Sequence, residues 1–380
     1  MTVTVPVPLE SYNKGVEAWS KVRFIRASWF SPLEAITYVD YFFRFVLPMA
    51  PIQLPDYQDA GKHATMLIED PVLAATILTI ASRFMSLTGP GAHTRGIFIH
   101  ERMWIYLEES LRRTANAQEQ SGGGFFGPGQ RVTCNSVGEP SVGLCSLGTI
   151  ESLLLLTEWH PRALHFPRGD DNDELLTPDH LDPSLADENH DATDATASTV
   201  NKWREPVWRS DRMSWSFLSQ AIAMAKFLRL WSEMHDNQSR RLKNVRRFLY
   251  IYANQTSCRF DMMPLLPEGI GEPFFSSGFL MAAETLFVGS VNDAVREEVR
   301  KPDVGQDMLL WFWIRLTQLT KRAYDALYPS RQHTRDLITS GRHKVTMQQF
   351  EPLLIKWRQD WEIFSANRKS RRFISLYLPP

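Results

Sequence analysis

Four consecutive leucines, Leu153–Leu156, constrain the fold more than any other feature of the sequence. They lie within LCSLGTIESLLLLTEWHPRALHF, which runs from Leu144 to Phe166. Successive residues of an α-helix point about 100° apart, so four apolar residues in a row cover most of its circumference. We therefore expect a helix from Thr149 to Trp159 in the middle of the fold, with protein on nearly all sides. Pro161 disfavours helical dihedrals at His160, so the helix is expected to end there or one residue earlier.

Most other segments also predict helices. Ser31, Pro32 and Glu34 form a capping box with proline in the first turn, which satisfies backbone donors at a helix start. Asp70-Pro71 predicts a second start of the same kind, and Thr346 with Gln349 predicts another capping box. No segment shows the sustained two-residue alternation that strands require. The predicted class is all-α, an irregular multi-helix bundle or array interrupted by a disordered acidic linker.

Composition divides the chain into five expected parts. Residues 1–30 are interrupted by proline and are expected to form an extended lead-in. Between Gly169 and Thr199 the chain holds ten acidic residues and no Lys or Arg. Such a tract buries too little apolar surface to offset chain entropy, so we expect a disordered linker at 169–200. The two halves of the helical body are 31–168 and 201–365, and 366–380 form a basic tail.

Charge and cysteine content exclude several classes of protein. The 42 Lys and Arg residues balance 43 Asp and Glu residues, so the chain lacks the basic excess that DNA binding usually requires. Cys134, Cys145 and Cys258 are odd in number and far apart, which is typical of reduced thiols inside a cell. No apolar run reaches the roughly 18 residues of a membrane span, so no membrane partner is expected.

Several stretches resemble one protein family. The run IESLLLLTEWHPRALHFP strongly resembles the middle regulatory region of fungal zinc binuclear cluster transcription factors, the "fungal-specific transcription factor domain". WREPVWRSDRMSW (Trp203–Trp215), DPVLAATILTIASRFM (Asp70–Met85) and GPGAHTRGIFIHERMW (Gly89–Trp104) resemble other helices of that family. The likeness covers residues 30 to 360.

The resemblance implies a nuclear, non-enzymatic regulatory domain that controls RNA polymerase II transcription. It implies a homodimer or contact with other transcription proteins, and a small-molecule effector. The family's DNA-binding end needs six closely spaced cysteines, and three dispersed ones cannot build that cluster. We therefore expect no cofactor in this chain, with zinc and DNA contact only through a missing N-terminal segment. Either the chain is a fragment, or it is a cluster-less interaction scaffold that acts through protein contacts.

The expected site residues are structural ones around the end of the central helix. They are Glu158, Trp159, His160, Pro161, Arg162, His165 and Phe166. The imidazoles of His160 and His165 could ligate a metal or act as acid-base groups, but without paired cysteines a hydrogen-bonded structural role is favoured. Arg162 is expected to bind helix-end carbonyls or a carboxylate such as Glu151 or Glu158.

An enzymatic alternative depends on Asp170, Asp171 and Glu174, which could bind Mg²⁺ and a prenyl diphosphate on an all-α fold. Such a site needs carboxylates on a rigid helix face and a second ligand cluster opposite. Here the motif opens an expected linker, and the second candidate, Asn292-Asp293, is followed by Arg296 where a hydroxyl ligand is needed. No catalytic residue is therefore assigned.

Two features of the second half complete the prediction. The basic residues within Arg240–Arg247 are interpreted as the solvated face of a helix. A nuclear import signal is a candidate role for Arg368, Lys369, Arg371 and Arg372. The last predicted helix carries one apolar stripe, which consists of Phe350, Leu353, Leu354, Trp357, Trp361 and Phe364.

Overall fold

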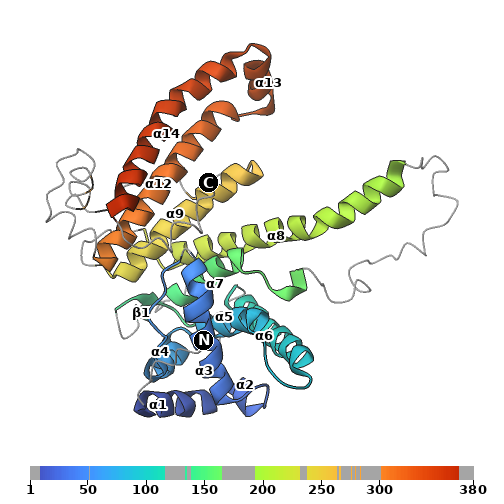
Figure 1. Ribbon diagram of the computed structural model, residues 1–380, viewed down its shortest axis with the longest axis vertical. Coiled ribbons are helices and arrows are strands. Elements are labelled where there is room, and N and C mark those ends of the chain that lie inside the picture. Colours follow the sequence, from blue (N-terminus) through green and yellow to red (C-terminus); the bar gives the residue numbers. More distant parts are fainter. Residues whose placement is uncertain are drawn as a thin grey trace, which may run out of the picture. The chain divides into compact units, whose positions relative to one another are not determined.

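The computed structural model describes residues 9–50, 52–115, 133–134, 138–164, 193–231, 238–262 and 301–367, with the single positions 265, 266, 275, 279 and 283. Most of these residues are helical (Figure 1), which confirms the predicted all-α class. The chain divides into two compact units, Met1–Ala221 and Ile222–Pro380. The expected bounds of the two halves, 31–168 and 201–365, stay a prediction. Within the described ranges, no helix is both long and apolar enough to cross a membrane.

The first unit contains most of the described elements. They are α1 (Leu9–Ser20), α2 (Arg23–Arg26), α3 (Pro32–Tyr41), the π-helical turn η1 (Phe42–Val46), the 3₁₀ turns η2 (Leu47–Met49) and η3 (Ala60–Lys62), α4 (His63–Glu69), α5 (Pro71–Phe84), α6 (Ala92–Ala115), the strands β1 (Thr133–Cys134) and β2 (Pro140–Ser141), α7 (Leu147–Glu158), the 3₁₀ turn η4 (Arg162–Leu164) and most of α8 (Thr193–Phe227).

Helices α5 and α7 form the centre of the first unit. Every residue from Val72 to Ser82 in α5 and from Leu147 to Thr157 in α7 is buried. α5 packs against α3, α6 and α7. α7 begins at the cap Ser146, whose hydroxyl accepts the backbone N–H of Thr149 at 3.3 Å. The burial predicted from the leucine run is therefore confirmed.

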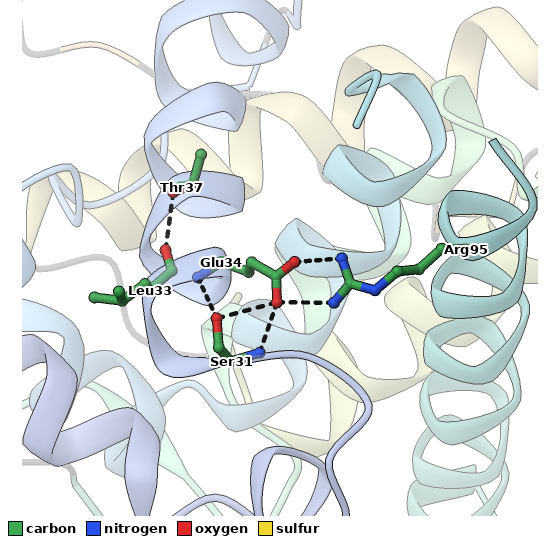
Figure 2. A network of polar contacts seen from close by, with 5 residues as sticks. All are labelled: Ser31, Leu33, Glu34, Thr37 and Arg95. Atoms are coloured by element: carbon green, nitrogen blue, oxygen red, sulfur yellow. Dashed lines mark hydrogen bonds and ion pairs between the residues drawn. The ribbon is translucent and has the colours of Figure 1, made fainter. Parts of the chain in front are cut away.

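The predicted capping box at the start of α3 is confirmed, and it also ties α3 to α6. Ser31 Oγ accepts the backbone N–H of Glu34 at 3.2 Å, and Glu34 Oε2 accepts the backbone N–H of Ser31 at 2.8 Å. Figure 2 shows that the guanidinium of Arg95 in α6 forks onto the same carboxylate, with Nη2 2.9 Å from Oε2. The Arg95 hydrogen bond is the main reason that the pKa of Glu34 is lowered to about 2.

The second predicted helix start is confirmed at Pro71, but the Asp70 side chain does not cap the helix. Asp70 precedes Pro71 at the start of α5, but its carboxylate makes no capping hydrogen bond to that helix. Instead it accepts the hydroxyl proton of Tyr57 at 2.7 Å and packs against Gly148 in the first turn of α7. Because a buried carboxylate is costly without polar partners, tertiary partners took precedence over the local cap.

The expected extended lead-in, residues 1–30, is wrong for residues 9–26, which form α1 and α2. The early prolines, Pro6 and Pro8, precede α1 and do not interrupt it. Trp19 of α1 is fully buried and donates from Nε1 to His63 Nδ1 at 2.8 Å. Burial against the rest of the unit therefore holds this helix in place.

Regular structure also begins within the expected linker and near residue 133. Of the expected linker, 169–192 lie outside the described residues, and 193–200 form the first turns of α8. Alanine and threonine dominate these helical residues, which lie beyond most of the acidic tract. Near residue 133, β1 pairs with β2 in antiparallel fashion, although no strand was predicted anywhere in the chain. Each strand has two residues, too few to show a two-residue period in the sequence.

The second unit contains the end of α8, then α9 (Arg240–Phe260), α12 (Pro302–Leu327), α13 (Arg331–Thr339) and α14 (Arg342–Asn367). α12 packs against both α9 and α14. A buried apolar stripe at helical spacing runs along α9. It consists of Leu242, Val245, Leu249 and Tyr252.

The interpretation of Arg240–Arg247 as a solvated face is wrong for Arg246 and Arg247, which are buried. Arg247 Nη1 donates to Asp307 Oδ1 in α12 at 2.6 Å and to Asn244 Oδ1 at 3.0 Å. Its guanidinium carbon also lies 4.1 Å from the ring centroid of Phe275. Because the counter-ion is 60 residues away in sequence, the local charge pattern could not predict this burial.

The start of α14 differs from the prediction. The helix begins at Arg342, so Thr346 lies inside it and donates its hydroxyl to the Arg342 carbonyl at 3.3 Å. The predicted capping box with Gln349 is therefore wrong. A Thr hydroxyl that is not at a helix start commonly bonds the carbonyl four residues earlier, which removes it from capping.

Only the C-terminal half of the predicted α14 stripe is well covered. The ring of Phe312 in α12 lies 5.9, 5.2 and 5.4 Å from the rings of Trp357, Trp361 and Phe364. By contrast, Leu353 and Leu354 are 38% and 46% exposed. The stripe predicted a buried face along the whole helix, and the described part of the second unit covers one half of it.

Candidate functional site

The turn after α7 holds the site residues that the sequence singles out. Five of them are described: Glu158, Trp159, His160, Pro161 and Arg162. His165 and Phe166 lie outside the described residues. Pro161 is buried and Glu158, the last residue of α7, is exposed. The turn therefore faces both the interior and the surface of the first unit.

His160 joins this turn to α8. Ser214 of α8 donates its hydroxyl proton to the carbonyl of Thr157 at 3.1 Å. Its lone pairs then accept the Nε2–H of His160, also at 3.1 Å, and the hydroxyl of Ser210 lies 3.4 Å from the same nitrogen. These contacts satisfy a carbonyl that the last turn of α7 leaves open.

His100 of α6 joins the same turn to α5. It is 3% exposed, and its Nδ1 donates to the carbonyl of Thr79 at 3.0 Å. Its Nε2 accepts the backbone N–H of Arg162 at 3.0 Å. Burial lowers the pKa of His100 to about 4, with smaller lowering contributions from Arg83 and Arg162. The ring is therefore neutral at physiological pH, and both of its nitrogens are engaged.

Aromatic and cationic groups complete this corner of the first unit. The indole of Trp159 meets the ring of Phe84 edge-on, with centroids 5.4 Å apart. The guanidinium of Arg83 lies 5.1 Å from the Phe84 ring, and burial lowers the pKa of Arg83, with a contribution from nearby Arg162. Residues of α5, α6, α7 and α8 thus meet in this corner, as the predicted structural role requires.

Metal binding finds no ready-made site in the described residues. No group of three or more His, Cys, Asp or Glu side chains among them is placed to hold a metal ion. The three cysteines form no disulfide with one another: Cys134 is exposed, Cys145 buried and Cys258 half-buried. Cys258 lies in the other unit from Cys134 and Cys145. Three thiols placed in this way do not fit a six-cysteine zinc cluster.

Other candidate residues fall where the structure gives no description. The carboxylates of the enzymatic alternative, Asp170, Asp171 and Glu174, lie outside the described residues, as does the second cluster, Asn292-Asp293. The same holds for the candidate import signal, whose residues are Arg368, Lys369, Arg371 and Arg372. These assignments stay predictions.

The first unit contains a cavity of about 550 Å³ between α2 and α6. Three aromatic rings form much of its wall: those of Phe24, Trp29 and Tyr106. The rings of Phe24 and Trp29 stack at 6.0 Å, and Tyr106 meets Phe24 edge-on at 5.5 Å. The aromatic wall is therefore held by its own packing, and the cavity volume is in the range of small-molecule sites.

A tight turn after α2 places Trp29 in this wall. Ser28 has φ of +58°, in the left-handed region, and its N–H donates to the carbonyl of Ile25 at 2.8 Å. The N–H of Trp29 then donates to the carbonyl of Phe24 at 3.1 Å. A left-handed residue just beyond a helix reverses the chain in this manner. The reversal places the two aromatic side chains face to face.

Arginines surround the cavity. Arg23, Arg102 and Arg113 line it, together with the carboxylate of Glu109. Glu109 accepts hydrogen bonds from Arg112 and Arg113 at 2.8 Å, and these bonds lower the pKa of Glu109 to about 2. Its negative charge is thus already shared by two guanidinium groups, and the rim of the cavity carries a net positive charge.

The second unit has a separate cavity of about 750 Å³. Its lining includes Cys258, Asp261, Tyr324, Arg331 and Arg335. The hydroxyl of Tyr324 donates to Asp261, which raises the pKa of Tyr324 to about 12, while burial raises the pKa of the Cys258 thiol. Both shifts favour the neutral, protonated side chains, so this pair offers no activated nucleophile.

His100 and the cavity arginines were not predicted as site residues, for different reasons. His100 follows Ile99 within an apolar helical face, and its position there is a signal for burial. Arg23 lies in a four-residue helix that has no detectable period, and Arg102 is 79 positions further along the chain. Their proximity depends on how α2 packs near α6, which no local pattern records.

Comparison with known proteins shows a similarity to a transcription factor. No protein-family model matches the chain, and no solved structure matches it. It is similar to the transcription factor hmgR of Aspergillus fumigatus, with 31% identity over 378 aligned residues that cover 93% of this chain. The alignment covers 45% of that relative, so the chain spans less than half the length of the protein that it matches.

Proposed function

We propose that this chain is a regulatory part of a fungal transcription factor. The observation that carries the proposal is the similarity to the transcription factor hmgR, which extends over 93% of the chain. A likeness of this extent includes both compact units and is not confined to the leucine-rich motif. The proposed role is nuclear and depends on binding, not on catalysis.

DNA recognition is assigned in this proposal to a segment other than these 380 residues. Their charge is balanced at −1, whereas phosphate neutralisation by Lys and Arg supplies most of the affinity for DNA. The three cysteines are too few and too dispersed for the zinc cluster of this class of factor. The chain alone is expected to hold no stoichiometric zinc and to bind DNA weakly, which metal analysis and a salt titration of DNA binding would check.

Two surfaces support a role in binding. The cavity between α2 and α6 is of a size that suits a small effector. On α14, Met347 and Leu354 are 58% and 46% exposed, and they belong to an apolar seam at heptad spacing. The seam consists of Met347, Phe350, Leu354, Trp357, Trp361 and Phe364. The C-terminal half of the seam already packs on α12, so we assign its exposed half, which contains Met347 and Leu354, to self-association of two copies.

A reporter assay tests the proposal. The full chain is fused to a heterologous DNA-binding domain in a fungal host, and transcription from the matching promoter is measured. The fusion is expected to change transcription at least several-fold relative to the DNA-binding domain alone, in activation or repression. A fusion that is nuclear and folded but leaves transcription at the level of the DNA-binding domain alone would contradict the proposal.

A further inference from the structure

We propose that the cavity between α2 and α6 binds a small organic anion that has a flat apolar body. The proposal deepens the effector role given above and rests on it only for its regulatory meaning. Binding itself follows from two properties of the cavity, its aromatic wall and its uncompensated positive charge.

The wall suits a flat apolar group. Phe24 is buried, and Trp29 and Tyr106 meet edge-on with centroids 6.4 Å apart. Val72 and Leu144 add aliphatic surface to the lining. Aromatic rings prefer offset-stacked or edge-on partners, so a planar ligand gains contact with several rings at once. Since these rings already pack against one another, little side-chain entropy is lost on binding.

The charge comes from Arg23 and Arg102. Neither guanidinium forms an ion pair with a carboxylate in the described part of the chain. Arg102 lies over the rings of Phe98 and Trp29, with its guanidinium carbon 4.4 and 5.5 Å from their centroids. The cavity rim thus presents two cations without described counter-ions beside an aromatic wall.

Guanidinium chemistry defines the polar end of the ligand. Its planar fork of N–H donors matches the two oxygens of a carboxylate or phosphate. Stacking on Trp29 and Phe98 also restricts the Arg102 fork, so less of its freedom is lost when it binds an anion. The ligand class is therefore a carboxylate or phosphate attached to a planar apolar group.

Isothermal titration calorimetry of the purified full chain tests the inference with three probes. They are 2-naphthoate, 2-naphthyl phosphate and the neutral 2-naphthalenemethanol. The naphthoate is expected to bind about tenfold more tightly than the alcohol, and its affinity should fall as salt is raised. Tighter binding of the phosphate than of the carboxylate supports the same site and names phosphate as the preferred anion.

Matched variants locate the binding. Arg23→Gln and Arg102→Gln are each expected to weaken naphthoate binding about tenfold and to leave binding of the alcohol unchanged. Arg26→Gln is the control, because Arg26 lies on the same short helix as Arg23 but does not line the cavity. Both Arg23 and Arg102 are exposed, so the variants should fold, which equal melting temperatures would verify.

Three results would overturn the inference: no binding of either anion at about 5 mM, equal affinity for naphthoate and the alcohol, or equal effects of Arg102→Gln and Arg26→Gln. Failure of the proposed function looks different, because it is read from transcription and not from calorimetry. If the probes bind as expected while the reporter fusion has no effect, the cavity assignment stands and the regulatory proposal fails.

Discussion

At the level of single residues, two buried histidines of the first unit are neutral and form hydrogen bonds through both ring nitrogens. His63 is 1% exposed, and its Nδ1 accepts from the indole of Trp19 while Nε2 donates to the Tyr57 carbonyl at 3.0 Å. His100 makes the corresponding pair of bonds to Thr79 and Arg162. Burial lowers the pKa of both imidazoles to about 4.

These pKa values predict a loss of stability in mild acid. An imidazole with a pKa near 6.5 in the unfolded chain takes up a proton there well before the folded one does, so stability falls as the pH falls from 6.5 towards 4. The free energy of unfolding of the first unit should drop by about 2 kcal/mol per buried histidine between pH 7.5 and 5. Denaturant titrations at both pH values would measure the drop.

Variants separate this cause from general acid effects. His100→Gln should be less stable at pH 7.5, yet lose about 2 kcal/mol less than the wild type on acidification to pH 5. His93→Gln serves as the control, because His93 is exposed on the same helix, and its pH dependence should match the wild type. If His100→Gln shows the wild-type pH dependence, then His100 is not held neutral in the folded protein.

In the second unit, the ion pair between Arg247 and Asp307 is expected to contribute to stability. The Arg247 side chain is 6% exposed and its ion pair with Asp307 is short, so removal of the carboxylate would take this ion pair away from a buried cation. Asp307→Asn is expected to lower the free energy of unfolding by about 3 kcal/mol. Asp325→Asn, which breaks an exposed pair with Lys321, should change it by less than about 1 kcal/mol. Similar losses in both variants would contradict the assigned role.

At the scale of elements, local patterns predicted the helices, and distant partners decided the exceptions. The leucine run and the Ser31–Glu34 box were sufficient because their information lies within one or two helical turns. Asp70 and Arg247 departed from the prediction because their partners, Tyr57 and Asp307, lie outside the helices that Asp70 and Arg247 belong to. Hydrophobic periodicity therefore predicted helix positions well, but not how each polar side chain is satisfied.

The close contact between α7 and the start of α5 predicts that a Gly→Ala substitution in α7 lowers stability, whereas such a substitution usually raises it. In a helix interior, Gly→Ala normally stabilises by about 1 kcal/mol. At Gly148, however, an added Cβ would lie 2.7 Å from Cγ of the buried Asp70. Gly148→Ala should therefore destabilise the first unit by about 3 kcal/mol, as overpacking of a close contact does.

A glycine elsewhere in the first unit provides the control. Gly96 lies in α6, and a Cβ there would have its nearest neighbour, Leu87 Cδ1, at 4.0 Å. Gly96→Ala should stabilise the protein by about 0.5 kcal/mol or more in thermal or denaturant unfolding. If both substitutions stabilise the protein, α7 does not pack against Asp70 as closely as described.

The candidate site was predictable only in part. The end of α7 and the structural role expected for His160 follow from Pro161 and the leucine run, and the bonds from His160 to α8 are compatible with that role. The cavity between α2 and α6 was not predictable for two reasons. Helix α2 has only four residues, and Ser28 adopts left-handed backbone angles that a serine in a sequence does not indicate.

At the scale of the whole molecule, self-association through the α14 seam is open to direct test. Substitution of both Met347 and Leu354 by Glu should weaken dimerisation at least about tenfold in sedimentation equilibrium, because charges would enter an apolar interface. Ile68→Glu is the control, since Ile68 is 80% exposed in the other unit and lies outside the seam. A wild-type chain that stays monomeric at about 100 µM would exclude this interface.

We propose that the effect of this chain on transcription depends on what its first unit binds. The most direct measurement compares reporter output from the wild-type fusion with output from its Arg102→Gln and Arg26→Gln variants, at equal protein levels. Arg102→Gln is expected to change the output several-fold, while Arg26→Gln should match the wild type. Identical output from all three fusions would contradict the claim.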